Sequence, residues 1–337
     1  MSLIEIKSHG LTLGRRVASG SPMTAALVAL LLAVLLIGAV TTPNFLTLFN
    51  AKTIIRDAAL VGIMGIGLTF VTLSGNFFLL SMKETAAICI ITFAMGMAHG
   101  YEFGLSLLAT MAVAIASGAA QGLLIGLGGN PIVVTLGAAG LLYGVASWWS
   151  DNLVVAFRRP NGAEWLGSGF TFGLPNITVA FILIAIVAEI VLRYTNFGRE
   201  VYLIGSNRAA GRATGHENLP MAIKVCVIAA VCSGFVAVAF AAQISSAQAN
   251  YFSSEFGSSG DMTISVIATV MVGGNAINGG FGSTLRTSIG AIFIAVVDNM
   301  MVLRGFTSGP RILSVGLIIV LSIVVFAAAR RGRRTVE

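Results

Sequence analysis

The chain has 337 residues, of which 56% are hydrophobic and only 10% are charged, and its mean hydropathy is +0.93. A soluble protein carries about 25% charged residues, so this composition excludes a soluble enzyme, a nucleic-acid-binding domain and a disordered chain. The net charge of +7 is concentrated in a few loops and at the C-terminus, which is typical of membrane orientation rather than of a nucleic-acid surface.

Continuous apolar runs predict an all-α polytopic membrane protein with about ten transmembrane helices, in the range of eight to ten. Runs without alternation argue against a membrane β-barrel, and a spanning helix needs about 20 mostly apolar residues. The weakest runs are 77–98, which contains Lys83 and Glu84, and 261–273, which is too short to span alone. In chain order the runs are 22–40, 58–74, 77–98, 104–127, 132–150, 176–193, 221–243, 261–273, 284–303 and 311–329.

The domain organisation follows from these runs and from the basic residues. We expect a cytoplasmic N-terminal segment over 1–21, a single transmembrane domain over 22–330 and a basic cytoplasmic tail over 331–337. The first run is interpreted as an uncleaved span, because it is long for a signal peptide and lacks a clear cleavage site. With an even number of spans, both termini and the basic loop at 193–224 lie in the cytoplasm, as the positive-inside rule requires.

Glycine marks two further features. Gly118, Gly122 and Gly126 recur every four residues, so they share one helix face on which a second helix backbone can pack closely. The second feature is the glycine-rich stretch 273–282. It is either a turn at the membrane surface or part of a re-entrant segment over 261–282 that lines a transport pathway.

Motifs for enzymatic chemistry are missing from the sequence. It contains no Walker A motif, no H-E-x-x-H and no G-x-S-x-G, so we expect no catalytic residues in this chain. Cys89, Cys226 and Cys232 lie inside apolar runs without metal-site or disulfide spacing, so they are interpreted as small core residues, and no metal site is expected.

Charged residues inside the apolar runs need a reason, because charge in hydrocarbon is costly. Glu189 and Arg193 are spaced to pair on one helix. Asp298, with Asn299 beside it, either lines a solute path or fixes helix packing through an interhelical hydrogen bond.

The longest loop expected in the cytoplasm is 194–220. Its middle, from Asn207 to Thr214, predicts a short helix that Ser206 or Asn207 caps and Gly215 ends. Such a helix is suited to dock in a groove of a partner, and the alternative is an ordinary connecting loop.

The same loop contains Thr195-Asn196-Phe197-Gly198-Arg199, Val201-Tyr202, Ile204-Gly205 and Asn207. These residues resemble the signature cytoplasmic loop of ribose-type ABC importer permeases. Two other stretches agree with the same family: 121–125 with 130–137, and 267–274 with 279–283 and 298–299. The resemblance covers about residues 40 to 330 in the family's order.

The resemblance implies the membrane subunit of an importer for a monosaccharide or a related small polar solute in a bacterial inner membrane. In that family two permeases pair, as a homodimer or heterodimer, around a central pathway. A separate cytoplasmic ATPase binds ATP and Mg, and a periplasmic or lipid-anchored solute-binding protein delivers the solute for import by alternating access. This chain would need no cofactor of its own.

The candidate site residues form two groups. The segment that couples to the ATPase is Gly205, Ser206, Asn207, Arg208, Ala209, Ala210, Gly211, Arg212, Thr214 and Gly215. The substrate pathway or gate comprises Asn76, Phe77, Phe78, Asn130, Pro131, Gly273, Gly274, Asn275, Asp298 and Asn299.

The sequence departs from the family pattern at three places. The acidic residue usual in the stretch matching 74–84 is replaced by phenylalanine, Ser265 stands at a second acidic position, and the usual Glu-Ala-Ala reads Ala209-Ala210-Gly211. Pentoses, hexoses, nucleosides and small signalling sugars are therefore all candidate solutes. The competing hypotheses are a self-sufficient secondary transporter or channel, and a structural protein that is a membrane scaffold or an inactive relative of the permeases.

Overall fold

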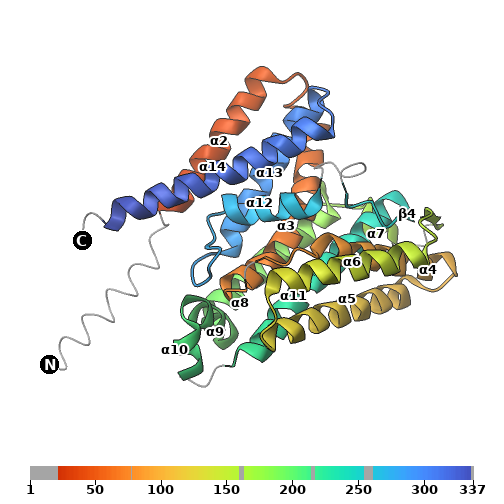
Figure 1. The fold of residues 1–337 in the computed structure, drawn as a ribbon. Helices are drawn as coiled ribbons and strands as arrows, with labels where there is room; N and C mark the ends of the chain where they lie inside the picture. The colour runs from red at the N-terminus through yellow and green to blue at the C-terminus, as the bar shows by residue number, and fades with distance from the viewer. Residues whose placement is uncertain (1–21, 77, 159–162, 214–216, 254–260, 335–337) are drawn as a thin grey trace.

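The computed structural model describes residues 22–76, 78–158, 163–213, 217–253 and 261–334, and most of these residues are helical (Figure 1). Ten helices match the apolar runs, and three shorter helices lie between them. The ten are α2 (Pro22–Thr41), α3 (Leu48–Leu73), α4 (Met82–Ala98), α5 (Phe103–Gly126), α6 (Pro131–Trp149), α8 (Asn176–Tyr194), α11 (Asn218–Ile244), α12 (Met262–Val272), α13 (Thr284–Leu303) and α14 (Ser308–Arg334). The shorter helices are α7 (Ala163–Gly167), α9 (Asn196–Ser206) and α10 (Arg208–Ala213).

Within these described residues, seven helices are long and apolar enough to cross a membrane: α2, α3, α5, α6, α8, α11 and α13. The all-α polytopic fold is therefore confirmed, whereas a total of ten spans stays a prediction. Three of the ten helices are not among these seven. Two of them, α4 with 17 residues and α12 with 11, match the runs that are weakest in the sequence. The third is α14, whose apolar character is described over 308–322.

Two helix starts differ from the apolar runs. α3 begins at Leu48 although its first turns carry Lys52, Arg56 and Asp57, so its polar beginning hid it from a hydropathy pattern. α4 begins at Met82 rather than at residue 77, because the chain before it is irregular. Leu79 in this irregular stretch is nevertheless only 1% exposed. The stretch is therefore apolar because it is buried, and not because it is helical.

Four strands of two residues each occur among the described residues, and no strand was predicted. β1 (Val155–Ala156) pairs antiparallel with β4 (Ser246–Ala247), and β2 (Phe170–Thr171) pairs antiparallel with β3 (Leu174–Pro175). They tie together the connections at the end of the molecule away from α9 and α10 (Figure 1).

The centre of the molecule is built from α3, α4 and α11, whose side chains are largely buried. The glycine stripe of α5 packs on α11, as its spacing predicted. A Cβ added to Gly118 would lie 2.7 Å from the carbonyl oxygen of Cys226, and one added to Gly122 would lie 2.6 Å from the Cα of Ile223. The two backbones thus touch where any side chain on the stripe would separate them.

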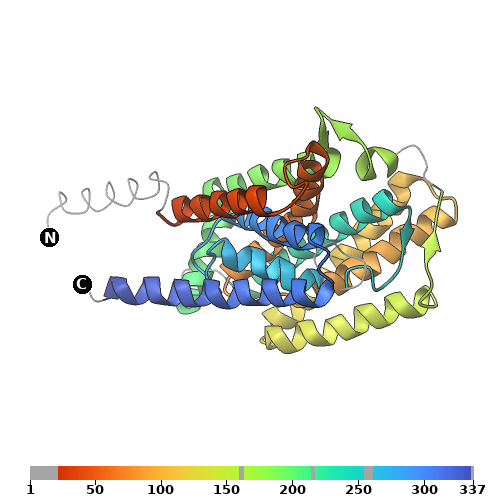
Figure 2. The same cartoon turned by 90° about the horizontal axis from the view of Figure 1, so that it is seen from above.

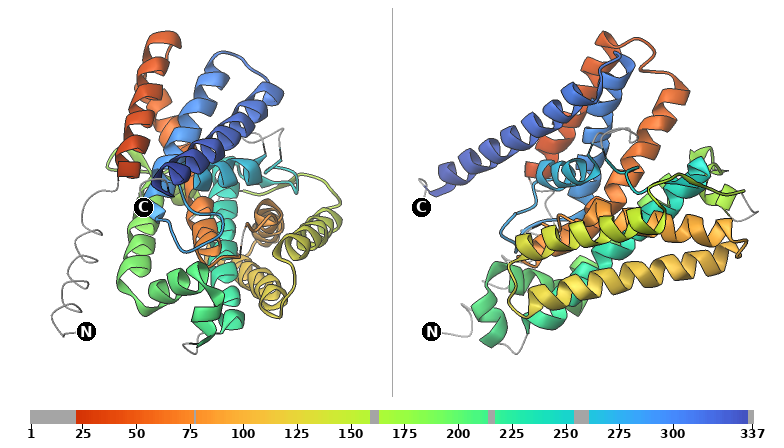
Figure 3. Two further views of the ribbon diagram at one scale, coloured as in Figure 1. Left: turned by 60° about the vertical axis from the view of Figure 1, so that its left-hand side comes forward. Right: turned by 45° about the vertical axis from the view of Figure 1, so that its right-hand side comes forward.

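The two outermost helices of the chain lead toward the same side of the molecule. The start of α2 and the end of α14 both point toward the side that carries α9 and α10 (Figures 1 and 2). The views in Figure 3 show the same relation from two further directions. This arrangement fits the predicted topology, in which both termini and the coupling loop share one side of the membrane.

Candidate coupling and translocation site

The described part of the loop 194–220, which contains the predicted coupling segment, forms two short helices, α9 and α10. Thr195 caps α9, since its Oγ1 accepts a hydrogen bond from the backbone N–H of Gly198 at 3.2 Å. The inward face of α9 buries Gly198, Val201 and Ile204, which recur every three residues. The segment is therefore a helical element packed on the membrane helices rather than an extended loop.

Asn207 separates the two helices and caps the second. Its Oδ1 accepts from the backbone N–H of Ala209 at 2.9 Å, and its backbone C=O accepts from Gly211 N–H at 3.0 Å. Ser206 is not the cap, because its Oγ donates back to the carbonyl of Leu203 at 2.9 Å. The predicted short helix is thus present as α10, while Thr214 and Gly215, at its predicted end, lie outside the described residues.

The end of α9 meets two loops that lie far away in the sequence. One is the α3–α4 loop (74–81), and the other is the glycine-rich loop (273–283) between α12 and α13. Arg208 Nη2 donates to the carbonyl of Gly75 at 2.7 Å and to Oδ1 of Asn76 at 2.9 Å. Gly280 N–H donates to the carbonyl of Leu73 at 3.0 Å. We call this meeting point the three-loop junction. Its three members are the α3–α4 loop, the glycine-rich loop and the end of α9, which belongs to the cytoplasmic loop predicted at 194–220.

The three-loop junction is packed backbone against backbone. A Cβ added to Gly205 would lie 1.8 Å from the carbonyl oxygen of Leu73 and 2.8 Å from the nitrogen of Gly280. Gly279 has φ +88, and its added Cβ would lie 2.7 Å from the carbonyl oxygen of Gly205. Glycine is required at both positions, because nothing larger fits between these main chains.

Glu189, on α8, holds the first turn of α13. Its carboxylate accepts from Thr284 N–H at 2.9 Å, from Thr284 Oγ1 at 2.7 Å and from Ser283 Oγ at 2.9 Å. Arg193 Nε also donates to this carboxylate, which confirms the pairing expected from the spacing. Glu189 is only 7% exposed, so an α8 side chain acts as a buried cap for α13.

This interhelical cap was not predicted, although Ser283 and Thr284 directly before an apolar run were a helix-start signal. Their partner was not visible in the sequence, because Glu189 lies 95 residues earlier in the chain.

Asn275 fastens the glycine-rich loop from inside. Its Nδ2 donates to Oγ1 of Thr287 at 2.8 Å, and its Oδ1 accepts from Ser283 N–H at 2.8 Å. Thr287 Oγ1 lies 2.7 Å from Oγ1 of Thr69, which links the loop to α3. These bonds make the loop a fixed connection between α3, α12 and α13.

Tyr202, on α9, was also missed as a site residue. Its hydroxyl donates to the carbonyl of Gly282 at 2.8 Å, so α9 holds the glycine-rich loop at a second point. Burial, together with the negative charge of Glu189, raises the pKa of Tyr202 to about 12. The hydroxyl therefore stays protonated and able to donate at any physiological pH.

Asp298 and Asn299, toward the other end of α13, are held by partners on neighbouring helices. Arg311 donates from Nε and Nη2 to the two oxygens of Asp298 at 2.9 and 2.7 Å. Asn299 and Asn50 exchange two amide hydrogen bonds of 2.8 and 2.9 Å. These contacts join α13 to α14 and to α3, which matches the packing alternative. A role of either residue in the solute path stays a prediction.

The other predicted pathway residues divide by position. Asn76 and the stretch 273–275 belong to the three-loop junction or adjoin it, as described above. Asn130 is exposed and caps α6 through Ile132 N–H at 3.0 Å, with Pro131 as the first helical residue. No hydrogen bond among the described residues ties Asn130 to the junction. Phe78 is half-buried against the core, and Phe77 lies outside the described residues.

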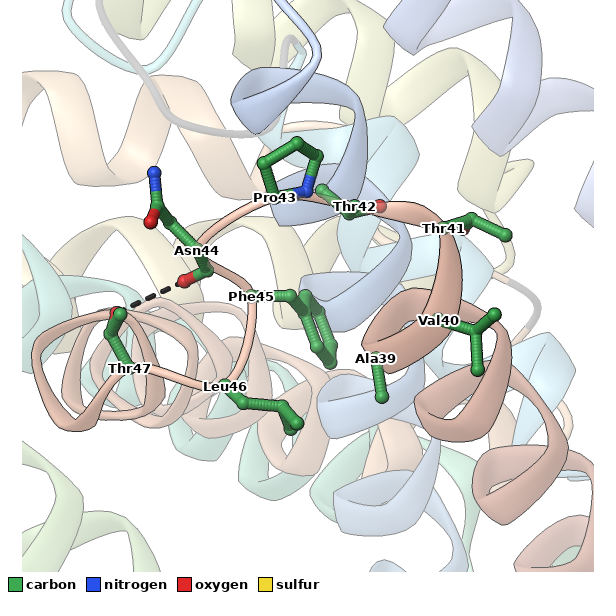
Figure 4. A pocket seen from close by; sticks show the side chains of 9 residues that line it. All are labelled: Ala39, Val40, Thr41, Thr42, Pro43, Asn44, Phe45, Leu46 and Thr47. Carbon is green, nitrogen blue, oxygen red and sulfur yellow. Dashed lines mark hydrogen bonds between the residues drawn. The ribbon is translucent and has the colours of Figure 1, made fainter.

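Figure 4 shows a hollow that is lined by residues 39–47 of the connection between α2 and α3. Thr47 Oγ1 donates to the carbonyl of Asn44 at 3.0 Å within it. Arg304, just after α13, donates to Oγ1 of Thr42 at 3.3 Å, so the hollow lies at the end of α13 away from the three-loop junction. None of the predicted site residues lines it.

Comparison with known proteins gives one family. Residues 50–326 match the family model described as branched-chain amino acid transport system / permease component. The chain is 25% identical to the ribose import permease protein RbsC of Bacillus subtilis (strain 168), over 86% of this chain and 88% of that relative. It is 26% identical to RbsC of Escherichia coli (strain K12), over 89% of this chain and 92% of that relative. It is 27% identical to the autoinducer 2 import system permease protein LsrC of Enterobacter sp. (strain 638), over 77% of this chain and 74% of that relative. No solved structure matches.

Proposed function

Because the chain belongs to the family described as branched-chain amino acid transport system / permease component, we propose that it carries a monosaccharide or a related small polar solute. It is a transmembrane subunit of an ABC importer in an inner membrane, as are the relatives that cover most of its length. The relatives named for ribose and autoinducer 2 import support the proposed solute class. The glycine-rich loop and the coupling segment agree with this assignment.

One observation carries the proposed mechanism, namely that the three-loop junction joins α9 and α10 to the α3–α4 loop and to the glycine-rich loop. Arg208 and Gly205 touch the loop that begins α4 and the loop that begins α13. In our proposal, a separate ATPase pulls on α9–α10 when it binds ATP and Mg. The movement then passes through the junction to α3–α4 and α12–α13, and access alternates between the two sides of the membrane.

The proposed topology places both termini and the three-loop junction in the cytoplasm. A solute-binding protein then delivers the solute at the end of the molecule that carries the short strands.

A second permease copy completes the pathway. Gly137, Gly140 and Gly144 on α6 support this pairing, because a Cβ on any of them would meet nothing within 4 Å. An open glycine face on a membrane helix favours close contact with another helix.

The test of this function is purification of the chain from its native membranes in mild detergent, with mass spectrometry of the proteins that remain bound. We expect an ATPase that carries a Walker A motif, together with a solute-binding protein whose bound sugar identifies the solute. The Arg208→Ala variant should retain less ATPase, because it loses both hydrogen bonds to the α3–α4 loop. Isolation of the chain alone, with ion-driven uptake by the purified protein, would instead establish a secondary transporter.

A further inference from the structure

Two helices begin inside the membrane domain rather than at its surface. α12 has 11 residues, which is about 16 Å and roughly half of a bilayer's hydrocarbon thickness. Its last residue leads into the three-loop junction, so its first turn lies near the middle of the membrane. α4 also starts inside the protein, because Ser81, just before it, is 0% exposed and donates its hydroxyl to Gln121, five residues before the end of α5.

Charged side chains meet at these two helix starts. Lys83, in the first turn of α4, forms an ion pair with Asp261, which caps α12. Asp261 Oδ1 accepts from Thr263 N–H at 3.0 Å, and Glu84 lies 3.8 Å from the ammonium of Lys83. The three charged side chains are 13 to 24% exposed, so open space reaches them although the surrounding helices are buried.

Around these two helix starts, four buried polar atoms have no hydrogen-bond partner in the part of the chain that the structure describes. Glu84 Oε2, Thr85 Oγ1, Thr263 Oγ1 and Gln121 Nε2 are buried and accept or donate no hydrogen bond among the described residues. Thr85 is 0% and Gln121 is 3% exposed. The other end of the Gln121 amide binds Ser81, which places its free Nε2 beside the first turn of α4. Buried polar atoms without a partner are costly, so four of them at one site indicate that something else binds them.

We propose that the starts of α4 and α12 form a solute-binding site for a neutral, polyhydroxylated molecule, built from Lys83, Glu84, Asp261 and the unpartnered groups of Thr85, Gln121 and Thr263. Carboxylates accept hydrogen bonds from hydroxyl groups, and the ammonium and amide groups donate to them. Two carboxylates against one ammonium leave the site negative, so it rejects phosphorylated sugars. The inference rests on the proposed function and adds the place and charge class of the solute.

Thr263→Val and Thr85→Val test the site, because each removes a hydroxyl that has no hydrogen-bond partner within the described part of the chain. If these hydroxyl groups had only a structural role, their removal would leave the stability of the protein unchanged or raise it. The importer, assembled with its ATPase and solute-binding protein in proteoliposomes, is given an equimolar mixture of D-ribose, D-xylose, D-glucose, D-galactose and D-ribose 5-phosphate. Chromatography that separates the isomeric sugars, coupled to mass spectrometry of the lumen, identifies the sugar that the wild type accumulates with ATP, and that sugar is used for the variants.

We expect each variant to accumulate about fivefold less sugar per ATP hydrolysed, which is the loss of about one hydrogen bond to the solute, at an unchanged thermal midpoint. Thr110→Val is the matched control, since that buried hydroxyl donates to the carbonyl of Ser106 at 2.7 Å. It should lower the thermal midpoint and leave sugar per ATP unchanged.

The outcomes separate the two proposals. Wild-type sugar yield per ATP in both variants would overturn the binding site while the importer function stands, and so would preferred accumulation of D-ribose 5-phosphate. A wild type that accumulates none of these sugars would overturn the proposed solute class, and with it this site.

Discussion

At the scale of the single residue, Gly205 is the position where the coupling segment tolerates least change. Alanine normally stabilises a helix relative to glycine, but here its Cβ would lie 1.8 Å from the carbonyl oxygen of Leu73. Gly205→Ala must therefore push α9 away from the α3–α4 loop. We expect ATP-driven uptake in proteoliposomes to fall at least tenfold, while membrane insertion and ATP hydrolysis by the partner persist.

A matched substitution separates this effect from a general cost of replacing glycine. Gly104 lies in the first turn of α5, and a Cβ there would meet nothing within 4 Å. Gly104→Ala should leave uptake and its ratio to ATP hydrolysis at the wild-type level. Normal coupling in Gly205→Ala would mean that the three-loop junction does not transmit the ATPase movement.

At the scale of the element, α13 depends on a cap that another helix supplies. In the wild type, the ionised carboxylate of Glu189 accepts hydrogen bonds from Ser283 and from both polar groups of Thr284. Glu189→Gln keeps the size of the side chain but replaces this ionised acceptor with a neutral amide. Hydrogen bonds to a charged group contribute about 1.5–3 kcal/mol each when buried, so we expect a lower thermal midpoint. Hydrogen exchange should rise in the first turn of α13 and in the glycine-rich loop.

Glu102 provides the comparison for this substitution. It precedes α5 as the N-cap residue and is exposed, and its side chain makes no capping hydrogen bond. Glu102→Gln removes the same charge and should change neither the thermal midpoint nor the exchange of α13. If exchange in the first turn of α13 is the same in Glu189→Gln and wild type, the interhelical cap is not what holds α13.

The elements also show what a sequence can predict here. Apolar runs located ten helices because a buried or lipid-facing helix must be apolar along most of its length. The same signal failed at the start of α3, where Lys52 and Arg56 interrupt it, and at 78–81, where an apolar stretch is irregular. The short helix of the coupling segment was predicted from local caps and glycines, whereas its coupling role came from the family resemblance and stays a prediction. The three-loop junction was not predicted, because Gly75, Gly205 and Gly280 meet only after folding.

At the scale of the whole molecule, the chain exposes much of its apolar surface to its surroundings. α2 and α6 are the least buried of the seven long apolar helices. Lipid can cover leucine and valine, but it gains little contact from glycine. Gly137, Gly140 and Gly144 lie on one open face of α6, since they are spaced three and four residues apart. A face of this kind is better matched by a second helix backbone than by acyl chains.

Gly140→Leu tests whether this face holds the second permease copy. The new side chain meets nothing within 4 Å in the single chain, so the fold should persist. It would separate two helix backbones that touch at the glycine, and we expect native mass spectrometry of the purified importer to show loss of the permease pair. Ala116→Leu, on the exposed face of α5, adds a larger side chain to a comparable position and should leave the pair intact. An intact pair in Gly140→Leu would place the contact on another face, because a close glycine interface cannot accommodate a leucine.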